Sequence, residues 1–261
     1  YGKNRGVSNV SFSVQEGDIF GFLGPNGAGK STTIRSMLGF IQYESGDIKI
    51  LGKDAKKHRE EILKEIGYMP SEAMFYPHMR VKEIIKMAAD LRKMDCSKEA
   101  EKLCERLQID VNKKISELSL GNRKKVSIVC AMQHKPKLFI FDEPTSGLDP
   151  LMQTEFFELI KEYVREGATC MLSTHILSEV KQYCNNVAIM KDGEIQRVDS
   201  VENLTKTSAK RIKVVKDGKY EDYIFEGNLN TLVQDLAEHQ ITDILIEEPS
   251  LDEIFMGYYE N

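Results

Sequence analysis

A glycine-rich loop at residues 24–32 carries the most recognisable chemistry in this chain. It follows an apolar run, residues 19–23, and precedes a helical stretch. Glycines let the backbone wrap phosphates with its N–H groups, and the new helix aims its positive end at the anion. Lys30 is expected to reach the β- and γ-phosphates, and Ser31 to ligate Mg²⁺. The predicted nucleotide-binding residues are Gly24, Pro25, Asn26, Gly27, Ala28, Gly29, Lys30, Ser31 and Thr32.

An apolar run that ends in two acids, residues 138–143, supplies the second part of a nucleotide site. Asp142 is expected to hold the Mg²⁺ shell, and Glu143 to orient or deprotonate a water in line with the γ-phosphate. Two acids at a strand end would be equally consistent with a solvated turn if they stood alone. Residues 144–150 follow directly, however, and Thr174 and His175 follow the next expected strand.

These motifs, in this order, resemble the nucleotide-binding subunit of an ATP-binding cassette (ABC) transporter. The resemblance covers residues 1 to about 200. Besides the phosphate loop and the acidic strand, it rests on residues 118–122 at the family's signature position and on residues 146–149 at its D-loop. His175 stands at the switch histidine, and Tyr1 stands where the family places an aromatic ring on adenine.

The resemblance implies an ATPase that uses ATP and Mg²⁺, with Glu143, His175 and Lys30 as catalytic residues. His175 would sense the γ-phosphate and pair with Glu143. Ser119 and Gly121 would act on the nucleotide of a second subunit, either an identical chain or a paralogue. The family also implies an integral membrane permease as partner and a cytoplasmic position on the inner face of the membrane. Residues 249–255 resemble the end of the export subfamily.

Two departures from the family pattern bear on mechanism. Leu120 and Asn122 stand where the signature usually has glycine and glutamine, so we expect weakened closure of the two subunits on ATP. After residues 67–70 the family most often has a glutamine that touches Mg²⁺ or the attacking water, whereas this chain has Ser71 followed by Glu72. Either Glu72 supplies the longer polar reach, or the loop is chiefly a mechanical link.

The stretch 73–79 is rich in aromatic and Met side chains for a loop that leads into a helix. It is consistent with packing of a helical insertion. The interpretation favoured by the family is an adaptable exposed surface that grips a helix of the permease.

Composition limits the alternatives. The formal charge of −5 divides into +2 over residues 1–200 and −7 over residues 201–261, which argues against a nucleic-acid partner at the acidic end. No apolar stretch approaches the roughly eighteen residues of a membrane span, and no signal peptide is visible, so we expect a soluble or peripheral protein. The five cysteines form no C-x-x-C pair, which predicts neither a disulfide framework nor a zinc site.

The pattern of runs predicts an α/β fold: a P-loop NTPase core with a mostly parallel sheet, an antiparallel β subdomain and an α-helical insertion. Strands are expected at 10–14, 18–23, 48–51, 138–141, 168–172 and 187–190, and helices at 30–38, 150–165 and 176–184. Residues 1–200 would form the ATPase domain, with the helical insertion at about 72–133. Residues 201–261 would form a small α+β appendage, with strands at 211–215, 223–225 and 241–246 and helices near 228–238 and 250–257.

Two other function classes fit parts of the sequence. A soluble ABC ATPase acting on DNA or ribosomes would generally carry two cassettes or long coiled-coil arms, and neither is visible here. A non-hydrolysing regulatory module is suggested by Leu120, Asn122 and Ser71, but Glu143 and His175 count against it. We therefore predict the ATP-hydrolysing subunit of an exporter whose permease is a separate chain.

Overall fold

The computed structural model describes residues 6–72, 74–205 and 209–248, which belong to two units, Tyr1–Val198 and Asp199–Asn261. Tyr1 and the helix expected near 250–257 lie outside the described residues. None of the described helices combines the length and the apolar composition that a bilayer-spanning segment requires.

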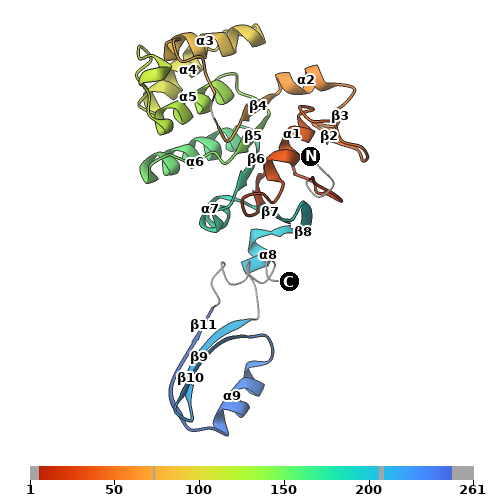
Figure 1. Ribbon diagram of the computed structural model, residues 1–261, viewed down its shortest axis with the longest axis vertical. Helices are drawn as coiled ribbons and strands as arrows, with labels where there is room; N and C mark the ends of the chain where they lie inside the picture. Colours follow the sequence, from red (N-terminus) through yellow and green to blue (C-terminus); the bar gives the residue numbers. More distant parts are fainter. Residues whose placement is uncertain (1–5, 73, 206–208, 249–261) are drawn as a thin grey trace. The chain divides into compact units, whose positions relative to one another are not determined.

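A six-stranded sheet forms the centre of the first unit, in the order β4-β5-β6-β1-β7-β8 (Figure 1). The strands β4, β5, β6, β1 and β7 pair in parallel. Helices connect most of them, as a parallel sheet requires. The strands are β1 (Ile19–Leu23), β4 (Ile66–Met69), β5 (Leu138–Asp142), β6 (Thr169–Thr174), β7 (Asn186–Lys191) and β8 (Glu194–Ser200). The predicted α/β fold with a mostly parallel sheet is confirmed.

The register of the parallel strands brings three of their carboxyl ends together. Leu23 at the end of β1 pairs with Thr174 at the end of β6, and Asp142 at the end of β5 pairs with Ser173. The segments that follow β1, β5 and β6 therefore leave the sheet at one edge, where ligands bind in open α/β sheets.

Four helices belong to this core: α1 (Lys30–Met37), α2 (Arg59–Lys64), α6 (Pro150–Arg165) and α7 (Leu177–Tyr183). The start of α6 is encoded locally. The Asp149 carboxylate accepts a hydrogen bond from Met152 N at 3.1 Å, and Pro150 occupies the first helical position, where a missing N–H does no harm.

The prediction of a strand at 10–14 is wrong, but the alternation of apolar and polar residues there does reflect burial. These residues form no strand, yet Val10, Phe12 and Val14 pack on the core. The Phe12 ring stacks on Phe20 and Phe22 of β1, with centroids 5.5 and 5.3 Å apart. Burial of alternate apolar side chains thus needs only an extended segment, not pairing with a neighbouring strand.

Antiparallel pairing also occurs in the first unit. Strands β2 (Lys49–Ile50) and β3 (Lys53–Asp54) make a two-residue ladder within the expected strand 48–51 and just beyond it. Strands β7 and β8 are neighbours joined by Asp192 and Gly193, both with positive φ (49° and 85°), as a tight hairpin turn requires.

The second unit is an α+β element: α8 (Val201–Thr205) leads into the three-stranded antiparallel sheet β10-β9-β11. Its strands are β9 (Lys210–Lys216), β10 (Lys219–Phe225) and β11 (Ile241–Glu247), and one helix, α9 (Leu229–Ala237), crosses between β10 and β11. Ile212 and Val214 of β9 pack with Leu232 and Leu236 of α9 to form a separate small core.

Between β4 and β5 the described residues form helices and no strand, as the sequence predicts for this insertion. These are α3 (Val81–Arg92), α4 (Ser97–Arg106), the 3₁₀ turn η1 (Ile115–Glu117) and α5 (Leu120–Met132). Figure 1 shows α3, α4 and α5 grouped together, and both α3 and α4 contact α5.

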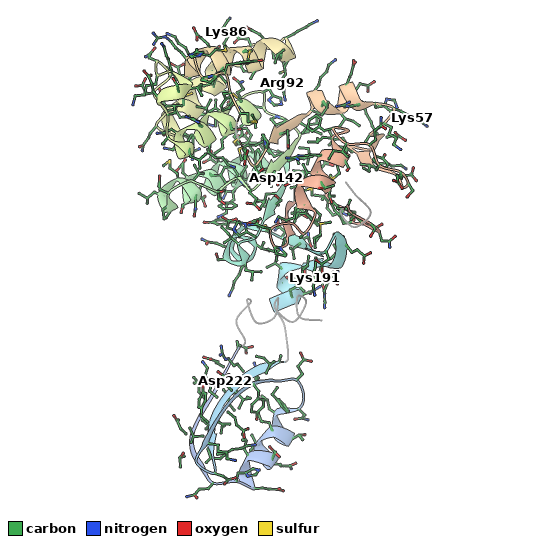
Figure 2. All side chains as sticks on the ribbon, in the orientation of Figure 1. Lys57, Lys86, Arg92, Asp142, Lys191 and Asp222 are labelled. Carbon is green, nitrogen blue, oxygen red and sulfur yellow. The ribbon has the colours of Figure 1, made fainter. Side chains whose placement is uncertain are left out.

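A buried polar contact fastens the end of this insertion to β4. Arg92 Nη2 and His134 Nε2 lie 3.0 and 3.1 Å from the Ile66 carbonyl oxygen, so both nitrogens donate to it. Arg92, labelled in Figure 2, ends α3, and His134 follows α5. Burial, reinforced by the Arg92 guanidinium, lowers the pKa of His134 to about 4.

This pKa predicts acid destabilisation of the fold. Below about pH 6.5 the unfolded chain protonates His134 while the folded chain does not, so stability is present above that pH and is lost as the pH falls towards 4. The loss at pH 5 should be about 2 kcal/mol. Urea unfolding at pH 7 and pH 5 measures it. His134→Gln keeps a donor but does not titrate, so its stability should change less between the two pH values; equal changes in both proteins would contradict the assignment.

Candidate nucleotide-binding and hydrolysis site

The glycine-rich loop joins β1 to α1 and adopts a backbone that its sequence dictates. Gly29, the residue before α1, has φ 106°, a conformation that glycine reaches without strain. Gly24 lies against β7: a Cβ there would be 2.4 Å from the Met190 carbonyl oxygen. Any side chain at Gly24 would therefore push the loop away from the sheet.

The other predicted loop residues lie on the same turn. Pro25, Asn26 and Gly27 are exposed, whereas Ala28 is buried; Ser31 and Thr32 occupy the first turn of α1 and are half-buried. The loop thus presents its tip to solvent and anchors its base in the core.

Lys30 is buried at the centre of this site. Its Nζ donates to the carbonyl oxygens of Gly24 and Pro25, at 2.7 and 3.1 Å, and lies 3.4 Å from Glu143 Oε1. A lysine is rarely buried without such partners. The ammonium is therefore held under the loop and towards the acidic end of β5.

Asp142 is fully buried at the end of β5, at the position labelled in Figure 2. Its Oδ1 accepts a hydrogen bond of 2.6 Å from Ser173 Oγ of β6. Its Oδ2 is buried and has no hydrogen-bond partner among the described residues. A buried carboxylate oxygen without a partner is costly, which marks it as an atom that a ligand completes.

Glu143 is held in a conformation that a free chain avoids. Its φ is 48°, in the left-handed region, and its N–H is shared between Ser173 O and Ser173 Oγ, each at 3.1 Å. Such a backbone costs on the order of 1 kcal/mol and persists only where neighbours impose it. Ser173 thus fixes both acids at once, one by its hydroxyl and one by its backbone and hydroxyl together.

His175 reaches the same carboxylate from the neighbouring strand end. Its Nδ1 lies 3.3 Å from Glu143 Oε1, the oxygen that also faces Lys30. The histidine is 43% exposed, so its outer edge faces solvent. Three residues that the sequence predicts to be catalytic, from three separate segments, therefore meet at one oxygen atom.

A buried carboxylate stiffens the segments around this meeting point. Glu179 of α7 accepts hydrogen bonds of 2.6 Å from Thr145 Oγ1 and from Thr174 Oγ1, one to each oxygen. Thr174 Oγ1 also accepts from Ile176 N at 3.0 Å. The chain after β5 and the chain after β6 are thereby tied to a common residue.

The signature residues lie at the start of α5. Ser119 is the N-cap, and its Oγ accepts a hydrogen bond from Asn122 N at 3.3 Å. Leu120 is 66% exposed. Gly121 lies close to the D-loop, since a Cβ on it would be 2.6 Å from Gly147 O. The structure therefore joins the signature to the D-loop but does not place it near Lys30 and Glu143 of the same chain by any direct contact among the described residues.

Three buried side chains at or beside this site are not predicted by the sequence: Ser173, Glu179 and Lys124. The first two stand next to recognised motifs, and a strand that ends in Ser-Thr-His could have suggested hydroxyl contacts to the acidic strand. Lys124, buried on α5, carries no signal of its own in the sequence.

Comparison with known proteins agrees with this geometry. The model of the family described as ABC transporter matches residues 7–146, more than half of the chain. This chain belongs to the ABC transporter family. As an ABC cassette it binds ATP and hydrolyses it in the service of transport.

Relatives and solved structures of this family cover most of the chain. The bacitracin transport ATP-binding protein BcrA of Bacillus licheniformis is 36% identical over 82% of this chain and 71% of its own length. The ABC transporter ATP-binding protein YdbJ of Bacillus subtilis (strain 168) is 32% identical over 93% of this chain and 82% of its own. A solved ATP-binding subunit of an ABC transporter superposes with a TM-score of 0.76 at 26% identity, covering 99% of this chain and 95% of that one.

The contacts of Lys30 predict its contribution to this ABC cassette. Lys30→Ala should abolish ATP binding at micromolar concentrations, because the buried ammonium that neutralises the phosphates is lost, while the fold remains. Calorimetric titration with ATP measures the affinity, and circular dichroism checks the fold. Lys57→Ala, which removes an exposed lysine, serves as the control. Unchanged affinity in Lys30→Ala would show that the loop is not the phosphate site.

Proposed function

We propose that this cassette powers export through a separately encoded membrane permease, as one of two subunits that close on two molecules of ATP and reopen after hydrolysis. Its similarity to BcrA, a bacitracin transport ATP-binding protein, supports an export role. The chain would act at the cytoplasmic face of the membrane, bound there by the permease. The second subunit is either a copy of this chain or a paralogue.

One observation carries the proposal for the chemistry: Lys30 and His175 both face Glu143 Oε1, at 3.4 and 3.3 Å. Glu143 is the base that accepts a proton from the attacking water. Its left-handed backbone, fixed by Ser173, directs the carboxylate towards the phosphate loop. His175 holds the carboxylate in place and binds the γ-phosphate as it departs.

The residues present fit a Mg²⁺ ion. Asp142 offers a buried carboxylate oxygen that has no hydrogen-bond partner among the described residues, and Ser31 offers a hydroxyl. Both are the oxygen ligands that Mg²⁺ prefers. The described residues include no cluster of three or more His, Cys, Asp or Glu, so phosphate and water oxygens would complete the shell. When bound, the ion would neutralise part of the negative charge of the triphosphate.

The partner subunit completes the site in this proposal. Ser119 and Gly121, at the positive end of α5, would contact the γ-phosphate held by the other subunit. Leu120 is well exposed beside them and Asn122 follows in the first turn, so the departures from the usual signature would act on closure of the two subunits rather than on ATP affinity of one chain.

The role of Glu143 gives the central prediction. Glu143→Gln should keep ATP binding and lose about 100-fold or more in turnover, because the amide fills the same space without accepting a proton. Phosphate release under saturating ATP measures turnover, and sedimentation measures the closed dimer, which should accumulate. Glu72→Gln is the matched control: Glu72 is exposed on the loop after β4, and its replacement should leave turnover near the wild-type value. Near wild-type hydrolysis by Glu143→Gln would refute the assignment.

We place the permease contact on the loop from Ser71 to Met79. Of its described residues, Met74 and Tyr76 are 88% and 64% exposed, an unusual exposure for such large apolar side chains. The loop starts where β4 ends, beside the acidic end of β5. A surface in this position could both bind a permease helix and respond to the state of the nucleotide.

Tyr76→Asp should abolish association with the cognate permease in detergent and leave ATPase activity of the isolated subunit intact, since a charge replaces the apolar ring that would be buried on docking. Co-purification measures association. Tyr220→Asp is a matched control, because Tyr220 in the second unit is also 64% exposed. Retention of the complex by Tyr76→Asp would contradict this placement, and its loss in Tyr220→Asp would move the contact to the acidic second unit.

A further inference from the structure

A lysine is buried on the face of α5 that packs on the core. Lys124 lies in the second turn of this helix and is 2% exposed. Lysine is almost never buried to this degree unless its ammonium is paired. A helix position that only needed to fill space would take an apolar residue, as Val126 and Ile128 do nearby. The charge of Lys124 therefore calls for an explanation.

The Lys124 ammonium contacts the loop that follows β4. Lys124 Nζ donates a 2.8 Å hydrogen bond to the Ser71 carbonyl oxygen. This contact joins the helical insertion to the loop at Ser71. At this position the family resemblance leads us to expect a glutamine, and Ser71 has a shorter side chain. The next residue, Glu72, has a longer polar side chain, but it is exposed to solvent.

Strand register places this contact beside the hydrolytic acids. Met69 of β4 pairs with Phe141 of β5, so residues 70–71 and residues 142–143 leave adjacent strands at the same level. Adjacent strands lie about 4.8 Å apart. Burial lowers the pKa of Lys124 to about 8. The negative charges of Asp142 and Glu143 oppose this shift, because they favour the charged form of the lysine.

We propose that Lys124 is a positioning residue for ATP hydrolysis, which supplies from the helical insertion the polar reach towards Asp142 and Glu143 that Ser71 lacks. The inference rests on the proposed role of Glu143. Held by the Ser71 carbonyl, the ammonium offsets the repulsion between two adjacent carboxylates and keeps them aligned.

The test replaces the charge and then restores the polar group from the loop. Lys124→Met removes the charge and the hydrogen bond in a side chain of similar length, and Lys124→Gln leaves a shorter neutral donor. Both should bind ATP within about twofold of wild type and lose about tenfold or more in kcat, because the phosphate loop is untouched while the acids lose their alignment.

A second substitution, in the loop, distinguishes a positioning role of Lys124 from a purely structural contact between α5 and the loop. In Lys124→Gln, adding Ser71→Gln should recover at least half of the lost kcat, because a glutamine at this position reaches towards the acids from the loop itself. Lys125→Gln, which neutralises the neighbouring half-buried lysine of α5, is the matched control and should retain wild-type kcat. Recovery by Ser71→Gln would support a positioning role, since a mere tether between α5 and the loop would gain nothing from it.

Three results would overturn the inference: kcat of Lys124→Met within twofold of wild type, loss of ATP affinity in parallel with kcat, or no recovery in the Ser71→Gln, Lys124→Gln double variant. Glu143→Gln measured in the same assay distinguishes this failure from that of the proposed function. If Glu143→Gln hydrolyses ATP normally, the assignment of the base fails. If Glu143→Gln is inactive while the Lys124 variants are active, only the role of Lys124 fails.

Discussion

The parallel pairing of β1, β5 and β6 is the constraint on which the site depends. Its register sets Leu23 opposite Thr174 and Asp142 opposite Ser173, so the phosphate loop, the two acids and His175 emerge at one edge of the sheet. A slip of one residue in either pairing would reverse the faces of the side chains in that strand. The apolar cores on both sides of the sheet prevent such a slip, and they therefore position the chemistry as well as stabilise the fold.

The charged groups at this edge of the sheet are compensated mainly by neighbouring polar and charged groups of the protein and less by water. Lys30 is buried under loop carbonyls, Asp142 is buried against Ser173, and Glu143 lies between Lys30 and His175. Interactions between such groups are stronger than at the surface, because less water screens them. The same burial makes the removal of one member costly, since its partner then remains charged without compensation.

The sequence predicted what depends on local pattern and on recognisable motifs. The elements α6 and β1, the helical insertion and the α/β class follow from periodicity and capping, and the start of α6 from Asp149 and Pro150. The strand prediction for residues 10–14 failed because the sequence pattern of alternate buried side chains is the same whether or not the segment pairs with a strand. Ser173 and Glu179 stand near recognised motifs, but their partners Asp142 and Thr145 lie 31 and 34 positions away. Lys124 and Ser71 lie 53 positions apart, and no local pattern pairs them.

The insertion of α3, α4 and α5 between β4 and β5 has a mechanical consequence. The chain leaves the sheet at the carboxyl end of β4 and returns at the amino end of the neighbouring parallel strand β5, so its two attachments lie about one strand length apart along the strands. Side-chain contacts reinforce both attachments: Lys124 meets Ser71 where β4 ends, and Arg92 and His134 meet Ile66 where β4 begins. A third attachment lies away from β4, because Arg106 of α4 pairs with Glu155 and Glu162 of α6. The insertion is therefore braced against the sheet and against α6, and a shift of α6 would be passed to it directly.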